Sequence, residues 1–247
     1  MPRDIVASTS ARRRPRLRRL VTVLGIVVGL VLGAAGVYSW SLPGTGDAEA
    51  RVQRGLAVSH GLETGRLPRR LAAAFVAVED RRYYEHGALD VHALARAIST
   101  VVGQRGVDPG GSTITQQLAK LLYPNSGGIG GGLGDVGVAF RLERRYSKAE
   151  ILEMYLTSVY LGDGFYGARR AALGYYHRPP ERLSWAQASM IAGLAQAPSA
   201  FDPRTHLLRA RHRQSQVVAA LVATRRLSTR AAREILQNPG ASAPAAR

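Results

Sequence analysis

The sequence predicts an all-α domain, because its apolar residues recur at helical spacing and its polar residues mark helix starts. Leu71, Phe75 and Val78 fall at i, i+4 and i+7, which places them on one face of a helix. Three further segments begin with Ser or Thr followed three residues later by Glu or Gln, the sequence pattern of a capping box. Few segments alternate apolar and polar residues with the period of two that strands show.

The first predicted element is a membrane-spanning helix at residues 20–40, which read LVTVLGIVVGLVLGAAGVYSW and carry no charge. About 20 apolar residues are enough to cross the hydrocarbon core of a bilayer. Seven arginines in residues 1–19 place that segment in the cytoplasm, and Tyr38 and Trp40 suit the far interface. We therefore expect a single-pass protein of the cytoplasmic membrane with its main domain on the extracellular side. A cleaved signal peptide is the alternative, because GAAG offers small residues, but its apolar region is usually only about 7–15 residues long.

The chain after this helix divides into three predicted segments. Residues 41–54 form a linker, since they begin with proline, glycine and polar residues. The helical domain runs over residues 55–227, and residues 228–247 form a C-terminal segment whose last ten residues are expected to be disordered. Six glycines in residues 127–134 lower helix propensity and predict a mobile loop. The capping pairs ahead of the domain's helices are Thr113 with Gln116, Ser147 with Glu150, and Ser184 with Gln187.

The charge balance indicates an anionic partner. Lysine and arginine total 34 against 17 acidic residues, a net charge of +17. Without residues 1–19, the remaining chain has 27 basic and 16 acidic residues, a net charge of +11. Nucleic acid, anionic lipid or a phosphorylated substrate would match this charge, but a domain outside the cytoplasm disfavours nucleic acid. The chain has no cysteine, which excludes disulfides and thiolate metal sites.

The segment VAVEDRRYYEHGALD, residues 76–90, holds the candidate for acid–base chemistry. An apolar run ends in Glu79 and Asp80, and arginines, tyrosines and a histidine follow. By itself the segment is either an ordinary solvated helix end, as most Glu-Asp pairs are, or a working carboxylate. These residues alone leave both interpretations open.

A second segment, DPGGSTITQQLAK at residues 108–120, joins a double glycine to a helix start. Backbone N–H groups at such a start can bind phosphate, and Lys120 adds a cation, although a turn followed by a simple N-cap is the alternative. The sequence contains no Gly-x-Ser-x-Gly elbow, no cysteine nucleophile and no convincing metal-ligand spacing. A carboxylate near arginines, an anion-binding helix start and a membrane anchor together favour transfer chemistry on a lipid-linked phosphate.

Four segments resemble, in order, the motifs of the peptidoglycan glycosyltransferases, the transglycosylase domains of class A penicillin-binding proteins and their monofunctional relatives. EDRRYYEH (79–86) matches the first motif, E-D-x-x-F-Y-x-H, and GGSTITQQLAK (110–120) is nearly identical to the second. YSKAEILEMYLTSVYLG (146–162) is similar to Y-S-K-x-E-I-L-E-x-Y-L-N-x-x-Y-x-G. Residues 166–203 parallel the segment that ends in Q-A-P-S-x-Y-D-P. The resemblance covers about residues 55–227.

The resemblance implies an all-α, lysozyme-like fold with a jaw near the membrane. It implies a reaction that joins disaccharide units of lipid II into β-1,4 glycan strands by an inverting transfer, with release of undecaprenyl pyrophosphate. The implied partners are lipid II, the nascent glycan strand, the membrane and other proteins of cell-wall synthesis. The implied cofactor is a divalent cation, Mg²⁺ or Mn²⁺, at the leaving pyrophosphate.

By the same resemblance, Glu79 is the general base on the acceptor 4-hydroxyl, and Arg82 and Lys120 face the pyrophosphate. The apolar run before Glu79 can raise the pKa of its carboxyl and so make it a stronger base. Asp80 is expected to hold nearby backbone or arginine groups at the substrate site. The other residues expected to line the cleft are Ser112, Thr113, Gln116 and Gln117.

The third family motif, Arg-Lys-x-x-Glu, is altered in this chain. Counting back from Tyr146 without gaps, its slots fall on residues 131–135, where glycines replace the basic pair. Asp135 replaces the second carboxylate and is expected to take its catalytic place. The lost pair removes two charge-assisted contacts, each worth about 1.5–3 kcal/mol.

This alteration leaves two hypotheses open. One is an active monofunctional glycosyltransferase, which the intact Glu79 and Lys120 favour. The other is a divergent, weakly active or inactive homologue that binds lipid II or glycan, or acts as a scaffold for cell-wall enzymes. A glycan-cleaving enzyme is disfavoured by the synthase motifs. A transpeptidase domain is not expected, because about 20 residues follow Leu227 and no Ser-x-x-Lys site with its partner motifs is present.

Overall fold

The computed structural model describes residues 29, 40–58, 68–90, 92, 112–124, 126 and 132–238 of the 247-residue chain. The chain separates into two compact units, Met1–Leu42 and Pro43–Arg247. The predicted membrane span at residues 20–40 lies outside the described residues, apart from Gly29 and Trp40. Within the described ranges, no helix has the length and apolar character that a bilayer crossing requires. The predicted cytoplasmic segment, residues 1–19, also lies outside them, as does the predicted disordered tail after Asn238.

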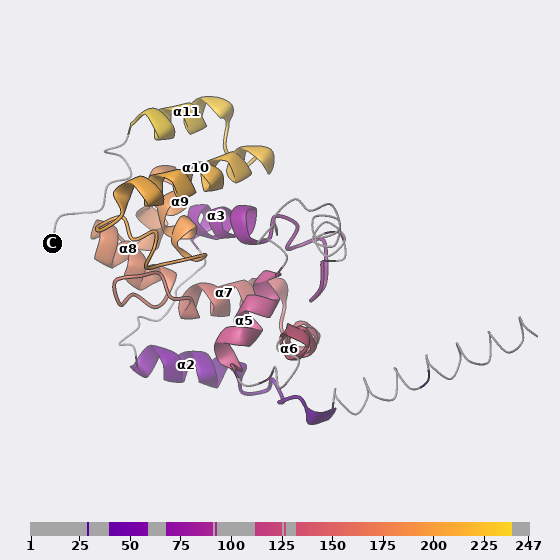
Figure 1. Ribbon diagram of the computed structural model, residues 1–247. Helices are drawn as coiled ribbons and strands as arrows, with labels where there is room; N and C mark the ends of the chain where they lie inside the picture. The colour runs from indigo at the N-terminus through magenta and orange to yellow at the C-terminus, as the bar shows by residue number, and fades with distance from the viewer. Residues whose placement is uncertain are drawn as a thin grey trace, which may run out of the picture. The chain divides into compact units, whose positions relative to one another are not determined.

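Among the described residues, the second unit is all-α, as predicted. The only extended pairing recorded in this part of the chain is an isolated antiparallel bridge between Tyr160 and Tyr166. The α-helices, labelled in Figure 1, are α2 (Ala48–Val58), α3 (Arg69–Glu79), α5 (Ile114–Leu122), α6 (Gly132–Arg145), α7 (Lys148–Ser158), α8 (Ala168–Tyr176), α9 (Trp185–Leu194), α10 (Leu207–Ala223) and α11 (Thr229–Gln237). A short 3-10 helix, η2 (Pro180–Arg182), precedes α9.

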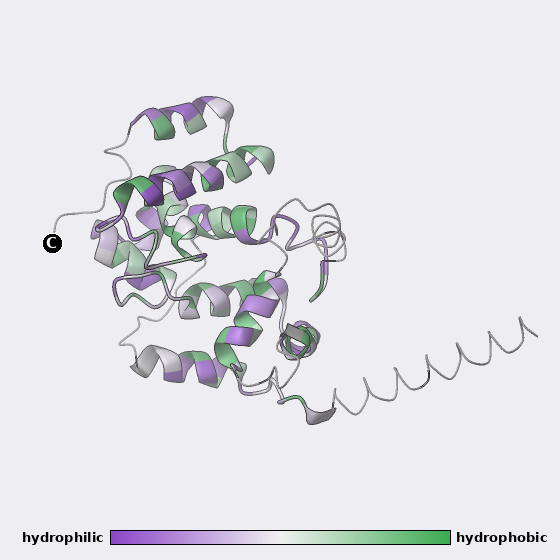
Figure 2. Ribbon diagram, in the orientation of Figure 1, coloured by the Kyte–Doolittle hydropathy of each residue, from purple (hydrophilic) through white to green (hydrophobic). Residues whose placement is uncertain are grey.

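Helix α3 carries the candidate base at its C-terminal end and packs against α9 and α10. Figure 1 shows α3 beside these two helices, and Figure 2 shows apolar residues along its middle. Leu71 and Phe75 are completely buried, as the helical spacing predicts, whereas Val78 is only partly buried. Burying a leucine or phenylalanine side chain stabilises a fold by about 1.5–3 kcal/mol. The end of α3 is therefore held firmly in the core.

The helices α2, α5, α6 and α7 form a second group: α5 packs against α6 and α7, and α2 packs against α7. The three predicted capping boxes are confirmed at the starts of α5, α7 and α9, each with both reciprocal bonds formed. Each box satisfies backbone N–H groups that a helix start leaves without partners. These caps fix where α5 begins, and so fix the position of the second motif.

Two segments that the sequence predicts to be irregular are helical in part. Helix α6 begins at Gly132, so the loop prediction is wrong for residues 132–134, while residues 127–131 lie outside the described ranges. Val138, Ala139 and Leu142 are completely buried where α6 packs against α5, and this burial offsets the low helix propensity of glycine. Helix α2 begins at Ala48, within the predicted linker, because Ala48 and Val52 share a buried face.

Candidate active site

Glu79 is the last residue of α3, and its side chain is 11% exposed. One carboxylate oxygen, Oε2, accepts a hydrogen bond from Nε2 of Gln117 at 3.0 Å. The other, Oε1, accepts one from Nη2 of Arg213 at 3.3 Å. The carboxylate therefore lies between a neutral donor on α5 and a cationic donor on α10, and both of its oxygens have defined positions.

Gln117 is itself oriented by Tyr155 of α7. The Tyr155 hydroxyl donates to Oε1 of Gln117 at 2.8 Å, so the amide N–H₂ group of Gln117 must face Glu79. The Tyr155 ring is held edge-on against Phe75, with 6.0 Å between the ring centroids. A chain of contacts from α7 through α5 thus sets the direction of one hydrogen bond to the carboxylate.

Burial raises the pKa of the Glu79 carboxyl above its ordinary value, and the neighbouring charge of Asp80 adds to this increase. The hydrogen bond from Gln117 and the positive charge of Arg213 oppose it, because both stabilise the carboxylate. The net direction is upward, so Glu79 is a stronger base than a solvated glutamate. The cation beside it still favours the ionised form that a base needs.

Asp80 follows Glu79 directly but makes separate contacts. Its Oδ1 atom lies 2.7 Å from Nε2 of His86, and its Oδ2 accepts the backbone N–H of Ile114 at 3.1 Å. The carboxylate therefore lies at the N-terminus of α5, where the helix dipole favours a negative charge. Asp80 connects the loop after α3 to the start of the second motif, and both of its oxygens bond to protein groups.

The structure places the predicted phosphate-facing residue Arg82 in an ion pair. Its guanidinium bonds both oxygens of Asp90, with Nε 3.3 Å from Oδ2, and the Asp90 side chain is only 7% exposed. Most of the charge of Arg82 is thereby compensated within the protein. Lys120, the other predicted cation, is exposed in the last turn of α5.

The start of α5 is closed by protein groups. Thr113 Oγ1 accepts the N–H of Gln116, and Ile114 gives its N–H to Asp80. The side chains of Thr113 and Gln116 also donate to the carbonyl of Ala88, at 3.1 and 2.9 Å. This arrangement favours the N-cap interpretation of the segment over an open anion site. Ser112 is exposed at the same end of the helix.

Asp135 lies in the first turn of α6, where its Oδ1 accepts a hydrogen bond from Ser126 at 3.4 Å. In the described part of the chain, the hydrogen-bond partners of Glu79 are Gln117 and Arg213. The structure therefore brings Glu79 and Gln117 together and gives Asp135 a separate partner. The catalytic and binding roles assigned to these residues stay predictions.

Asp80, His86 and Asp90 offer three atoms that lie within 4.8 Å of one another, a spacing that could hold a metal ion. Their atoms already have partners: Asp80 bonds His86 and Ile114, and Asp90 bonds Arg82 and the backbone N–H of His92. A resident ion would have to displace these bonds. In their present arrangement these bonds fasten the loop after α3.

Arg213 is the residue that sequence reasoning missed. Its side chain is 12% exposed, and α10 places it near Gly193 of α9, where an added Cβ would come within 3.2 Å of its Cγ. Burial lowers the pKa of Arg213, and the Glu79 charge opposes that shift. The available signal was its spacing: Ala210, Arg213 and Val217 fall at i, i+3 and i+7, so the arginine adjoins a buried face. In the sequence it looked like one of many surface cations.

In the described helices, the nearly buried Glu79 carboxylate lies between an amide and a guanidinium, an arrangement that acid–base catalysis can use. The family model described as Transglycosylase matches residues 55–222, and the chain belongs to this family. The chain is 40% identical over 152 residues to penicillin-binding protein 1A of Neisseria flavescens, covering 61% of this chain and 19% of that protein. It is 35% identical over 156 residues to penicillin-binding protein 1F of Bacillus subtilis (strain 168), covering 63% of this chain and 22% of that protein.

A longer match, 30% identical over 221 residues, joins the chain to penicillin-binding protein 1A of Pseudomonas aeruginosa, covering 81% of this chain and 27% of that protein. These curated relatives are therefore several times longer than the matched region. The crystal structure of penicillin-binding protein 1A from Haemophilus influenzae aligns with a TM-score of 0.46 and 22% identity, over 76% of this chain and 18% of that one.

Proposed function

We propose that the chain is a membrane-anchored, monofunctional peptidoglycan glycosyltransferase that polymerises lipid II into β-1,4 glycan strands. The observation that carries this proposal is the Glu79 carboxylate, which stands at the first-motif position of the family and is buried between Gln117 and Arg213. Burial and oriented donors are what a carboxylate needs to act as a base near neutral pH.

In this mechanism Glu79 accepts the proton of the acceptor 4-hydroxyl as its oxygen attacks the anomeric carbon of the growing strand. The bond from that carbon to the pyrophosphate oxygen breaks, undecaprenyl pyrophosphate leaves, and the configuration inverts from α to β. A carboxylate has about four lone-pair directions, so Glu79 can accept the hydroxyl while keeping its two present bonds. A positioned base of this kind contributes about 10²–10⁴-fold in rate.

The leaving pyrophosphate needs positive charge near it. Lys120 is exposed and free to turn toward a substrate, whereas Arg82 is paired with Asp90. We assign the larger part of this role to Lys120 in the last turn of α5, and a smaller part to Ser112, which precedes the same helix. Mg²⁺ or Mn²⁺ would arrive bound to the pyrophosphate, since the atoms of Asp80, His86 and Asp90 already bond protein groups.

The proposed membrane location rests on the uncharged residues 20–40 and on the surface of α6. Leu133 and Phe140 of α6 are 67% and 50% exposed, and they lie seven residues apart, two turns along one face. Arg141 of the same helix donates to the carbonyl of Pro43, near the start of the second unit. An exposed apolar face with arginines at its end suits the interface of a membrane.

A divergent lipid II- or glycan-binding protein is the second candidate. The observation that favours it is the environment of Asp135, whose recorded bond is to Ser126, together with the glycines at the basic-pair positions. If Asp135 has the second catalytic role, Asp135→Asn lowers turnover at least tenfold, because a neutral amide cannot act as a carboxylate. An unchanged rate discards that role for Asp135.

The two candidates are separated by incubating the full chain, in detergent, with lipid II and Mg²⁺ or Mn²⁺. The glycosyltransferase makes polymer that a muramidase digests, and a chelator lowers its rate if the metal accompanies the pyrophosphate. Binding of lipid II without polymer, across metals and detergents, would establish the binding protein instead.

A further inference from the structure

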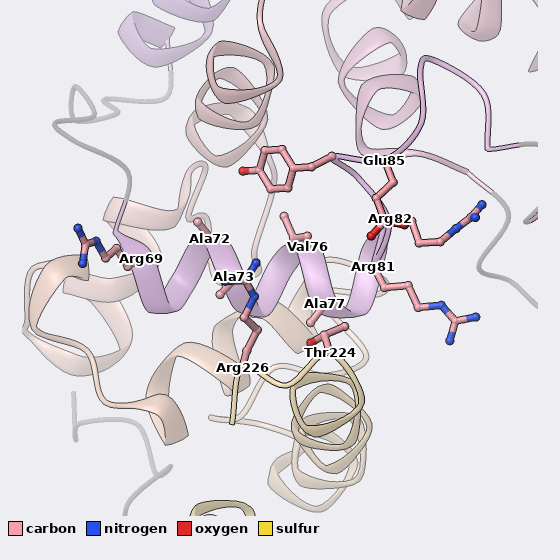
Figure 3. A pocket seen from close by; sticks show the side chains of 11 residues that line it. Arg69, Ala72, Ala73, Val76, Ala77, Arg81, Arg82, Glu85, Thr224 and Arg226 are labelled. Atoms are coloured by element: carbon pink, nitrogen blue, oxygen red, sulfur yellow. The ribbon is translucent and has the colours of Figure 1, made fainter. Parts of the chain in front are cut away.

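A groove runs along the exposed face of α3, away from the contacts of Glu79. Its floor consists of small apolar side chains, and its volume is about 530 Å³. Figure 3 shows Ala72, Ala73, Val76 and Ala77 along the helix, with Arg69 at one end and Arg81 at the other. Thr224 and Arg226 border it from the end of α10. The lining includes neither Glu79 nor its partners Gln117 and Arg213.

The groove has an excess of positive charge. Arg69, Arg81 and Arg226 are exposed, and no ion pair is recorded for them in the described part of the chain. Arg82 also lines the groove, but Asp90 compensates its charge. Glu85 is the one carboxylate in the lining, so the groove has a net charge of about +2. One arginine guanidinium can donate two parallel hydrogen bonds to the oxygens of a phosphate, so these arginines suit a phosphorylated ligand.

The floor favours a ligand that is partly apolar. Ala72, Ala73, Val76 and Ala77 line it, and its edge carries the hydroxyls of Tyr84 and Thr224, of which that of Thr224 already donates to the carbonyl of Ala220 at 2.9 Å. These four floor side chains offer a peptide backbone or a sugar no hydrogen-bonding group, and a lone phosphate would fill little of the volume. Helix α3 extends about 15 Å from Arg69 to Glu79, long enough for a short hydrocarbon chain to cover the alanines.

We infer that this groove binds a phosphate-bearing amphiphile, with its phosphate on the arginines and its first carbons on the alanine floor. The inference does not rest on the proposed transfer reaction, because it concerns binding outside the contacts of Glu79. Two sources share this chemistry, a glycerophospholipid of the bilayer and a polyprenyl diphosphate, and short-chain probes distinguish them.

The test maps arginine protection on the full chain in detergent. Phenylglyoxal modifies accessible arginines, and peptide mass spectrometry reads each position separately. The probes are dihexanoyl phosphatidylglycerol, farnesyl diphosphate, dihexanoyl phosphatidylcholine and inorganic pyrophosphate. We expect farnesyl diphosphate, dihexanoyl phosphatidylglycerol or both to slow modification of Arg69, Arg81 and Arg226 about fivefold or more. The exposed control residues Arg178, Arg182 and Arg233 should keep their rates.

A variant that fills the groove supplies the second readout. Ala73→Leu adds apolar volume without changing charge and should weaken the protection about tenfold, with helical content checked by circular dichroism. Equal protection by inorganic pyrophosphate would overturn the inference, because this probe has no hydrocarbon chain for the apolar floor. Equal protection by phosphatidylcholine would also overturn it, because this lipid has no net negative charge for the arginines. Protection of all six arginines alike, or of none, would also overturn it.

Discussion

At the scale of single residues, the account depends on the environment of one carboxylate. The Glu79 side chain is nearly buried, and its two oxygens meet a neutral and a cationic donor. Burial raises the pKa of Glu79 while Arg213 lowers it, so the ionisation of the base is a balance of two opposing effects. Both effects are open to measurement by substitution.

The first prediction concerns the pH dependence of the polymerisation rate. Only ionised Glu79 can accept a proton, so kcat/KM should fall as pH decreases through a pKa above that of an ordinary carboxyl. Arg213→Gln removes a cation that lowers this pKa, so the acidic limb should move to higher pH, with a greater loss at about pH 6 than at about pH 8. Arg233→Gln on α11, an exposed residue, is the control. An acidic limb that stays in place would show that Arg213 does not influence the base.

The second prediction concerns the orientation of Gln117. Tyr155→Phe removes the hydroxyl that donates to Oε1 of Gln117, which allows the amide to rotate away from Glu79. A buried hydrogen bond contributes about 0.5–1.5 kcal/mol, so kcat should fall up to about tenfold while lipid II binding changes little. Tyr176→Phe is the comparison, because this tyrosine is also buried, on α8, and the hydrogen bond to Oε1 of Gln117 comes from Tyr155. If both variants lose the same activity, the effect is one of packing.

The sequence predicted part of this residue-scale arrangement. Glu79 and Gln117 were recognisable because they lie in two motifs, and the structure places them in contact at 3.0 Å. Arg213 lies 134 residues from Glu79, and no local pattern predicts which of many arginines a fold brings to a carboxylate. Arg82 was expected to face phosphate, but its partner Asp90 lies just beyond the recognised motif. Which acidic residue pairs with Arg82 depends on the path of the loop after α3, and the local sequence does not specify that path.

At the scale of helices, the start of α5 is the junction that orders the site. Its N-cap Thr113 bonds the helix backbone and also the carbonyl of Ala88, and Asp80 accepts the N–H of Ile114. These contacts join the first and second motifs before any substrate binds. Gln117, less than two turns further along α5, is positioned by the same junction.

The third prediction tests this junction. Thr113→Ala removes an N-cap, which costs about 0.5–2 kcal/mol, and also leaves the buried carbonyl of Ala88 with one donor fewer. Ser147→Ala removes the equivalent cap at α7, where the exposed Ser147 hydroxyl donates to the Glu150 carboxylate rather than to a buried carbonyl. Urea unfolding should show a larger loss for Thr113→Ala, by about 1 kcal/mol, and only this variant should lose activity. If the two variants lost the same stability and the same activity, the contact between Thr113 and Ala88 would have no special role in ordering the site.

Helix starts were the best predicted features at this scale, because a capping box is local. Its two hydrogen bonds join side chains and backbone N–H groups within four residues. The beginning of α6 was predicted badly for the opposite reason. Glycine propensity argued for a loop through residue 134, but the burial of Val138 and Leu142 against α5 is a tertiary effect. Packing overrides propensity wherever a helix has a buried face.

At the scale of the whole molecule, the described helices and the family match agree on one transglycosylase domain. The family model covers residues 55–222, and the unit that begins at Pro43 includes all of them. The all-α class followed from helical periodicity and capping signals, but the lysozyme-like arrangement came only from the resemblance and stays a prediction. Periodicity shows which face of a helix is buried, and it does not say which helix covers that face.

The fourth prediction concerns membrane attachment. A chain that begins at Pro43 lacks residues 20–40 and should keep the helices of the second unit, because that unit begins there. The shortened chain would contact the membrane only through the exposed face of α6 and its arginines. High salt should therefore release it from bacterial membranes, and the amount of membrane-bound protein should fall about tenfold. Sedimentation with and without salt measures this. Retention in high salt would show that residues 20–40 are not the main anchor.

The most direct test of the central claim compares Glu79→Gln with Glu181→Gln in the polymerisation of lipid II. Both variants replace a glutamate by its neutral isostere, but Glu181 is exposed on η2. If Glu79 is the base, Glu79→Gln should reduce the single-turnover rate by about 10²–10⁴-fold and leave lipid II binding within a few-fold of the wild-type value, while Glu181→Gln keeps the full rate. A Glu79→Gln variant that forms glycan at the wild-type rate would contradict the account.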